Sequence, residues 1–238
     1  MRIAVLDADG EELALITSIL RSLGHDCQAF TRGGALQREL QRETFDLLVL
    51  DWQLPDTTGP EFARWARTTL KDRVPILLMT PRYEEEDIVE GLAAGADDII
   101  VSPIRVGELA ARVRALMRRA YAQQPTDDQT WGRYHFVPAR QRLEVDGTPV
   151  VLTQKQYNLA LLLFRNMGRV LSRRYLLESI WGISSPMGTE QASRSLDTHV
   201  SRVRTALRLR PESGYRLTAV YGQGYCFEAV EADASSLA

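Results

Sequence analysis

Residues 45–59 read FDLLVLDWQLPDTTG, and this stretch decides how the first half of the chain folds. A largely apolar run leads to Asp51, as is typical of a strand buried within a sheet. A polar turn containing Pro55 follows, and a helix-like segment begins at Gly59. A strand, a short turn and a helix in this order predict a β–α unit, with Asp51 at the carboxyl end of its strand.

The same alternation runs through the rest of residues 1–121. Strand-like runs lie at 2–7, 25–30, 74–80 and 97–103, and helix-like segments include 59–70, 84–95 and 107–119. Five β–α units with short connections predict an α/β domain built on a doubly wound, flavodoxin-like, five-stranded parallel sheet. In such a sheet, ligands bind at the carboxyl ends of the strands.

The pattern changes after a polar segment at 122–130, which we interpret as a linker. Residues 131–229 begin with short strands and a turn at Asp146-Gly147. Thr153 and Ser172 are expected to cap helices that end near Met167 and Trp181, and a third helix covers about 190–209. A hairpin at 215–228 and a polar tail at 230–238 follow. Helices followed by a hairpin predict a winged-helix domain of the α+β class.

Charge divides the chain in the same way. The net charge of the 238 residues is −2, but residues 1–122 hold 15 Arg and Lys against 20 Asp and Glu, whereas residues 131–226 hold 14 against 6. An acidic half joined to a basic half suggests a regulatory domain and a nucleic-acid-binding domain, although chance unevenness is an alternative. The longest apolar run, LALLLF, is too short to cross a membrane, the first residues do not resemble a signal peptide, and Cys27 and Cys226 form no motif. We expect a cytoplasmic protein.

Two families compete for the stretch VLDADG at 5–10. It resembles the first motif of the haloacid-dehalogenase phosphatases, with Asp7 as the nucleophile. Their final acidic pair would have to come from GADD at 95–98, but those acids precede a strand and so lie at the wrong edge of the sheet. The chain has only two lysines, Lys71 and Lys155, and neither suits the third motif. The phosphatase interpretation also leaves Asp51 without a role.

Residues 45–59, 75–80 and 84–104 resemble the receiver domain of two-component response regulators, and the likeness covers about 1–120. The resemblance implies that Asp51 accepts a phosphoryl group from a sensor histidine kinase. It also implies an acidic pocket of Asp7 and Asp9, Mg²⁺ held by Asp7 and Asp51, and switch positions at Thr80, Ser102 and Ile99.

Three positions depart from the receiver pattern together. Ala8 stands where the family has a metal-binding acid, Ser102 replaces a lysine, and Ile99 replaces a Tyr or Phe. The metal ligand and the lysine both bring positive charge to the transferring phosphoryl group, so losing both disfavours phosphotransfer. We therefore expect Asp51 to be phosphorylated weakly or not at all, and Mg²⁺ binding to be doubtful. Alternatively, Asp7 and Asp51 are relics satisfied by backbone N–H groups.

The second half resembles the winged-helix DNA-binding domain of the OmpR/PhoB-type branch, through 152–166, 170–182, 194–208 and 218–227. Leu196, Val200, Val203 and Leu207 recur at helical spacing and predict the buried side of the third helix. By resemblance, Arg194, His199 and Arg204 contact phosphates, and Thr198, Ser201 and Arg202 face the bases, with Arg208 on the same basic face. Tyr221 replaces the usual wing arginine, and the loop at 182–192 is a candidate contact for RNA polymerase.

The same branch forms a two-fold homodimer through the fourth helix, fifth strand and fifth helix of its receiver. The matching positions here are Ile88, Asp97, Asp98, Glu108, Arg112 and Arg119. Ile88 stands where the family has a basic partner for Glu108, so an apolar contact would replace one ion pair. The alternative is that these residues cover the core of their own domain.

Together these features predict a DNA-binding transcription regulator, not an enzyme, that binds tandem half-sites in double-stranded DNA as a dimer. We expect weak or no dependence on phosphorylation of Asp51. One alternative is a conventional regulator switched by a sensor histidine kinase. Another is a receiver-like scaffold that binds proteins, whose binding would lack the steep salt dependence of DNA contacts.

Overall fold

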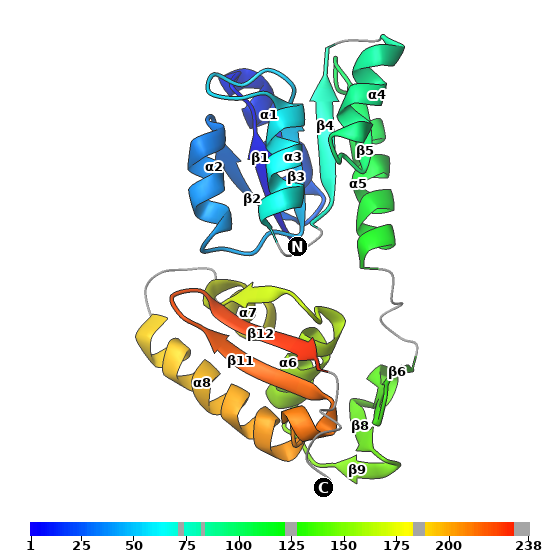
Figure 1. Cartoon of the computed structure of the whole chain (residues 1–238), viewed down its shortest axis with the longest axis vertical. Helices are drawn as coiled ribbons and strands as arrows, with labels where there is room; N and C mark the ends of the chain where they lie inside the picture. The colour runs from blue at the N-terminus through cyan, green and yellow to red at the C-terminus, as the bar shows by residue number, and fades with distance from the viewer. Residues whose placement is uncertain (71–73, 82–83, 122–127, 183–188, 231–238) are drawn as a thin grey trace, which may run out of the picture. The chain divides into compact units, whose positions relative to one another are not determined.

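The computed structural model describes residues 1–70, 74–81, 84–121, 128–182 and 189–230. Contacts divide the chain into two units, Met1–Ala122 and Gln123–Ala238 (Figure 1). The expected linker at 122–130 lies mostly outside the described residues, as does the tail at 230–238. The first described strand of the second unit already begins at Gln129.

The first unit is the five-stranded parallel sheet that the sequence predicts, with strand order β2-β1-β3-β4-β5. The strands are β1 (Arg2–Leu6), β2 (Asp26–Phe30), β3 (Leu47–Asp51), β4 (Ile76–Thr80) and β5 (Asp98–Val101). The helices are α1 (Gly10–Ser22), α2 (Gly33–Leu40), α3 (Gly59–Thr69), α4 (Glu85–Ala93) and α5 (Val106–Ala120). This doubly wound arrangement confirms the predicted fold class.

Both faces of this sheet are covered, which explains the near-continuous apolar strands. Because side chains alternate along a strand, Ile3 and Val5 pack with α1 and α5, whereas Ala4 and Leu6 pack with the cluster that includes α2 and α3. The strands are thereby fixed from both sides, and their carboxyl ends hold the polar residues that follow them.

The second unit begins with a four-stranded antiparallel sheet of β6 (Gln129–Trp131), β7 (Tyr134–Val137), β8 (Arg142–Val145) and β9 (Thr148–Val150). Asp146 and Gly147 join β8 to β9 with φ values of 50° and 74°. Two positive φ values are what a two-residue hairpin turn of the Asp-Gly type requires. The predicted turn is therefore confirmed.

Three helices and a small second sheet complete this unit. They are α6 (Gln154–Arg165), β10 (Val170–Ser172), α7 (Arg173–Trp181), α8 (Thr189–Ala206), β11 (Tyr215–Val220) and β12 (Gly224–Ala229). Two single turns of 3₁₀ helix occur in this unit: Pro138–Arg140 joins β7 to β8, and Pro211–Ser213 lies between α8 and β11. Thr153 caps α6 by accepting from the N–H of Gln156, and Ser172 caps α7 by accepting from that of Tyr175, as predicted.

The winged-helix core is aromatic and lies around Phe164. The rings of Trp131, Tyr134, Phe136, Tyr215 and Phe227 all lie within 6 Å of its ring. The predicted stripe of Leu196, Val200, Val203 and Leu207 is buried against this core. The stripe fixes which side of α8 faces outward.

Helix α8 ends at Ala206, about three residues before the expected end. Leu207 and Leu209 are both buried, and Arg208 between them has a φ of 52°. The N–H of Leu209 donates to the carbonyl of Arg204, which turns the chain out of the helix. Burial of two leucines thus ends the helix early and removes Arg208 from its face.

The glycine in the wing is required by a close approach between strands. A Cβ atom on Gly224 would lie 2.0 Å from the carbonyl oxygen of Leu171 in β10. Only glycine lets β12 pair with β10 and β11 at once at this point. Across the described ranges, no helix has the length and apolar character needed to cross a membrane.

Candidate functional site

The carboxyl ends of β1, β3, β4 and β5 place the predicted pocket residues at one edge of the sheet. Asp7 follows β1, Asp51 ends β3, Thr80 ends β4 and Ser102 follows β5. The N–H of Ser102 donates to the carbonyl of Thr80 at 2.8 Å. The side chains predicted from four separate segments thus gather at this edge.

Asp7 is the most enclosed carboxylate of the pocket, with 1% of its surface exposed. Its Oδ1 accepts from the N–H of Asp9 at 2.8 Å, whereas its Oδ2 is buried and has no hydrogen-bond partner. Burial raises the pKa of Asp7 to about 6, and the negative charges of Asp51 and Glu12 add to this rise against the hydrogen bond from Asp9. Ionisation of Asp7 at neutral pH therefore lowers the free energy of unfolding of the first unit.

Asp51 is partly exposed, and both of its oxygens are held by the backbone of the following loop. Oδ1 accepts from the N–H of Trp52 at 2.7 Å, and Oδ2 accepts from that of Gln53 at 3.2 Å. Burial raises the pKa of Asp51, the two backbone hydrogen bonds oppose the rise, and the charges of Glu12 and Asp9 add to it. No positive side chain is among the causes of either shift.

Asp9 is turned toward α1. Its Oδ1 accepts from the N–H groups of Glu11 and Glu12, at 2.8 and 3.1 Å, and so caps the helix. Its charge still raises the pKa of Asp7 and Asp51, but this oxygen is already engaged. Asp9 therefore belongs to the acidic pocket by its charge and serves the helix by its hydrogen bonds.

Glu12 is a pocket residue that sequence reasoning missed. The hydroxyl of Ser102 donates to its Oε1 at 3.1 Å, joining the first turn of α1 to the connection between β5 and α5. Ser102 stands at the position of the family lysine, so an acid now lies where a fixed cation is expected. The contact joins residues 90 positions apart, and no local sequence signal reveals it.

The residues present do not fit a conventional magnesium site. Mg²⁺ prefers several oxygen ligands in octahedral geometry, and the described residues contain no cluster of three acidic, His or Cys side chains arranged to hold a metal ion. Ala8 contributes no ligand, and the engaged oxygen of Asp9 faces α1. The partnerless Oδ2 of Asp7 is the feature that most resembles a ligand.

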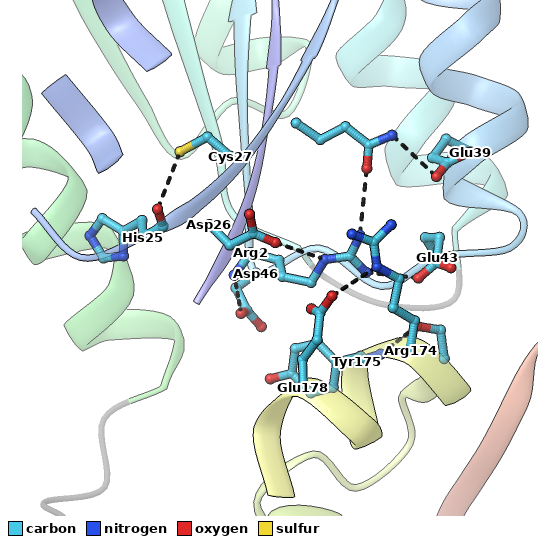
Figure 2. A network of polar contacts seen from close by, with 12 residues as sticks. Arg2, His25, Asp26, Cys27, Glu39, Glu43, Asp46, Arg174, Tyr175 and Glu178 are labelled. Carbon is cyan, nitrogen blue, oxygen red and sulfur yellow. Dashed lines mark hydrogen bonds and ion pairs between the residues drawn. The ribbon is translucent and has the colours of Figure 1, made fainter. Parts of the chain in front are cut away.

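A cation does hold together the opposite edge of the sheet. Arg2 lies at the start of β1, and its Nη1 is 2.7 Å from Glu43 and its Nε 3.7 Å from Asp26; Figure 2 draws these contacts as dashed lines. The backbone N–H of Arg2 also donates to Asp46 at 2.9 Å. Acids at the amino edge are thus balanced by an arginine, whereas the pocket acids form no ion pair with any described residue.

Ile99, at the position of the family switch aromatic, is buried in the core beneath α4. A Cβ atom on Gly91 of α4 would lie 2.8 Å from its Cδ1, which shows how closely the two approach. In this conformation Ile99 acts as a core residue that helps to fix α4 on the sheet.

Replacing Asp7 by Asn is expected to stabilise the first unit at neutral pH. The pKa of Asp7 lies above its ordinary value of 3.8, so its stabilising contribution is complete below pH 4 and is lost as the pH rises through about 6. The Asn side chain stays neutral and can still accept from the N–H of Asp9. We expect a gain in the free energy of unfolding of about 3 kcal/mol at pH 8 and about half that at pH 5.

Urea unfolding of the wild type and the Asp7→Asn variant at the two pH values measures this difference. The exposed carboxylate Glu11 offers a matched control, since Glu11→Gln should change the stability little at either pH. A gain for Asp7→Asn that does not depend on pH would contradict the assignment of the raised pKa.

The polar residues predicted at the dimer face are partly engaged within the chain. Arg112 bonds Asp98 at 2.9 Å and Glu108 at 2.8 Å, and Asp97 bonds Arg67 of α3 at 2.7 Å. Ile88 is half-buried and packs on the core. Arg119 is exposed near the end of α5, and α4 and α5 also expose three apolar side chains that were not predicted from the sequence: Val89, Leu92 and Val106.

The predicted DNA-binding residues of α8 fall into two groups, those exposed on its outward side and those that contact their own unit. Arg194, Thr198, Ser201 and Arg202 are exposed on the helix. His199 is half-buried, where its Nδ1 donates to the carbonyl of Ser195 and its ring packs edge-on against Trp181. Arg204 donates twice to the carbonyl of Leu217 in β11, and Arg208 follows the helix end.

The wing presents an uncharged tip. Tyr221 is fully exposed in the turn between β11 and β12, and Gly222 beside it has a φ of 70°. Arg216 on β11 is paired with Glu228 on β12 at 2.8 Å. In the described wing the exposed tip therefore offers a phenol ring and not a charge.

Comparison with known proteins gives a consistent picture for both units. Residues 3–114 match the response regulator receiver domain, and residues 147–227 match the C-terminal domain of transcriptional regulatory proteins. The phosphate regulon transcriptional regulatory protein PhoB of Rhizobium meliloti is 33% identical, with 96% of this chain and 99% of that protein covered. The sensory transduction protein RegX3 of Mycobacterium tuberculosis is also 33% identical, covering 92% of this chain and 96% of that protein. The crystal structure of the response regulator DrrB of Thermotoga maritima, an OmpR/PhoB homologue, covers 96% of this chain and 99% of that one at 27% identity and a TM-score of 0.46.

Proposed function

The chain belongs to the OmpR/PhoB-type response regulators, which are DNA-binding transcription regulators of two-component systems, and we propose that it binds DNA as a dimer with little or no dependence on phosphorylation of Asp51. The observation that carries this proposal is the composition of the pocket. After burial, the charges of Asp51, Glu12 and Asp9 raise the pKa of Asp7, and those of Glu12 and Asp9 raise the pKa of Asp51; no described cation pairs with any of the four.

Electrostatics disfavours phosphorylation in such a pocket. A phosphoryl group adds about 1.5 to 2 negative charges at neutral pH, and enzymes that transfer it stabilise this charge with fixed cations. Here the charge would be attached to Asp51 beside three other carboxylates, Asp7, Asp9 and Glu12, with a serine at the lysine position and without a conventional metal site. Burial and, to a smaller extent, the charges of Glu12 and Asp9 raise the pKa of Asp51, and both effects would also destabilise its phosphorylated form.

The Glu12–Ser102 hydrogen bond supplies a substitute for the missing signal in this proposal. The carboxylate of Glu12 lies beside Ser102 and joins α1 to the connection between β5 and α5. The connection that a phosphoryl group would reorganise is thereby held in one arrangement without modification. A single hydrogen bond of this kind contributes about 1 kcal/mol, enough to bias two arrangements about fivefold.

The dimer in this proposal forms through α4, β5 and α5. Val89, Leu92 and Val106 are exposed apolar side chains on these helices, and their burial against a second copy would stabilise association. Asp98, Glu108 and Arg112 already form a local network, and Arg119 remains exposed to pair with a partner. Two copies would then place two α8 helices on tandem half-sites.

DNA contact in this proposal comes from the exposed side of α8 and from the wing. Arg194, Thr198, Ser201 and Arg202 face outward, and Tyr221 offers a contact to sugar or phosphate without charge. His199, Arg204 and Arg208 would contribute from the edge of this surface. The proposed contact of the loop 182–192 with RNA polymerase falls mostly outside the described residues.

The decisive experiment compares Asp51→Ala with the wild type in binding to a site selected from random duplexes. We expect the two apparent dissociation constants, and the concentrations at which the proteins dimerise, to agree within about twofold, a free-energy difference below about 0.5 kcal/mol. Fluorescence anisotropy and sedimentation velocity measure the two quantities. Weaker binding by Asp51→Ala, together with stronger binding by the wild type after treatment with acetyl phosphate, would refute phosphorylation independence.

A conventional regulator paired with a sensor histidine kinase is the second candidate. Its support is that Asp51 stays partly exposed at the end of β3, with the following loop held in place by hydrogen bonds to its carboxylate.

A protein-binding scaffold is the third candidate, and the salt dependence of binding to duplex DNA distinguishes it from the other two. DNA binding should weaken with a log–log slope of about −0.9 for each phosphate contacted, whereas a scaffold should not respond in this way to duplex DNA at all.

A further inference from the structure

A polar network in the winged-helix unit joins three elements that must act together on DNA. Arg173 opens α7, Asp197 lies on the outward side of α8, and Tyr225 lies in β12 of the wing. Asp197 is an acid on the proposed DNA-facing side, where a free carboxylate would repel phosphates. Its contacts therefore need an explanation.

One carboxylate oxygen is the centre of the network. Oδ1 of Asp197 accepts from Nη2 of Arg173 and from the hydroxyl of Tyr225, both at 2.6 Å. The guanidinium of Arg173 also lies 5.7 Å from the centre of the Tyr225 ring and donates to the hydroxyl and the carbonyl of Ser193 in α8. The backbone N–H of Arg173 donates to the carbonyl of Gln223 in the wing turn at 3.1 Å.

These contacts act on charge as well as on geometry. Burial opposes ionisation of Asp197, but the hydrogen bonds from Tyr225 and Arg173 outweigh it and lower the pKa of Asp197. The carboxylate of Asp197 is thus ionised, and its negative charge is paired with the guanidinium of Arg173. Asp197 lies three residues after Arg194 and four before Ser201, so it occupies the same exposed stretch of α8.

We propose that Asp197 is a positioning residue for DNA recognition, which fixes α8 against the wing through Arg173 and Tyr225. This inference rests on α8 being the DNA-contacting helix, as proposed above. The helix enters one groove and the wing reaches a neighbouring part of the duplex, so their relative placement decides whether both can contact one site. An acid that stood there without this role would only weaken binding.

Positioning and repulsion predict opposite results for Asp197→Ala. Loss of positioning lowers affinity for the selected site about tenfold, the scale of one misplaced base contact, while affinity for a scrambled duplex of equal length stays equal or rises. Simple relief of repulsion raises both affinities together and leaves their ratio unchanged. The ratio of the two affinities is therefore the quantity to measure, by fluorescence anisotropy at several salt concentrations.

Tyr225→Phe and Glu212→Ala complete the experiment. Tyr225→Phe removes one hydroxyl from a buried ring and should lower the ratio in the same direction as Asp197→Ala, with a fall in melting temperature of only about a few degrees, as the loss of one hydrogen bond predicts. Glu212→Ala removes an equally charged, exposed acid outside the network and should leave the ratio unchanged. An unchanged ratio in both Asp197→Ala and Tyr225→Phe, or an equal fall of both affinities in Tyr225→Phe, would overturn the proposal.

Failure of this inference can be told apart from failure of the DNA-binding face. If α8 were not the contacting helix, Arg202→Ala would also leave both affinities unchanged. If only the positioning role were wrong, Arg202→Ala would weaken binding and the Asp197 and Tyr225 variants would not change the ratio.

Discussion

The triple variant Ala8→Asp, Glu12→Leu and Ser102→Lys is expected to raise the modification of Asp51 by acetyl phosphate and Mg²⁺ roughly a hundredfold over the wild type. The Ala8→Asp substitution would add a carboxylate ligand beside Asp7, and the Ser102→Lys substitution would add the fixed cation that the pocket lacks. The Glu12→Leu substitution would remove the carboxylate that accepts from Ser102 in the wild type, so that the new lysine is not paired with it. A single preorganised donor or cation at a transferring group is commonly worth about a hundredfold in rate.

Intact-mass spectrometry after a fixed incubation measures this change. The same triple variant carrying Asp51→Asn is the control, because it keeps the rebuilt pocket and removes the acceptor. Each single substitution should give a smaller increase, since the ligand and the cation stabilise the same developing charge. Extensive modification of the wild type under the same conditions would show that the pocket needs no such repair.

The fold was predictable because its signals are local. Buried parallel strands need continuous apolar runs, so the run that ends at Asp51 identifies β3, and four similar runs identify the other strands of the sheet. The caps at Thr153 and Ser172 and the turn at Asp146-Gly147 depend only on neighbouring residues. Each was therefore found at its observed position.

The pocket was only partly predictable because its contacts are not local. Asp7, Asp51, Thr80 and Ser102 could be placed together, since carboxyl ends of parallel strands share one edge. Glu12 could not, because its partner Ser102 lies 90 residues away and its role depends on the start of α1 at Gly10. Asp9 was placed in the pocket by sequence, but whether an acid caps a helix or faces a ligand is decided by the helix start.

The arginines of the second unit show the same limit. Helical periodicity predicts Arg202 and Arg208 on one basic side of the helix, and the family resemblance adds Arg204, but tertiary contacts separate the three. Arg204 is drawn to the carbonyl of Leu217, and the burial of Leu207 and Leu209 ends the helix before Arg208. An arginine that donates to its own domain has fewer donors left for DNA. The structure therefore predicts a larger DNA contribution from Arg202 than from Arg204, a difference that the sequence alone does not show.

Arg202→Ala is therefore expected to cause the largest loss of DNA binding among the single substitutions of α8. Arg202 is exposed and makes no hydrogen bond or ion pair with the described residues, so its whole guanidinium fork is available. A base-facing arginine contributes about 1–3 kcal/mol, which corresponds to a loss of roughly 5- to 150-fold in affinity for the selected site. Preference should relax at one base pair of each half-site.

Anisotropy titrations against the selected site and its single-base variants measure both effects. Arg140→Ala is the matched control, because it removes the same charge from an exposed position in the first 3₁₀ turn of the same unit. A phosphate contact would instead weaken binding to all sequences equally and reduce the salt slope by about 0.9. Equal losses in Arg202→Ala and Arg140→Ala would show that only net charge matters and that this side of α8 does not face the bases. A larger loss confined to Arg202→Ala, with relaxed preference at one base pair, would place this arginine in the groove, because net charge alone cannot discriminate between bases.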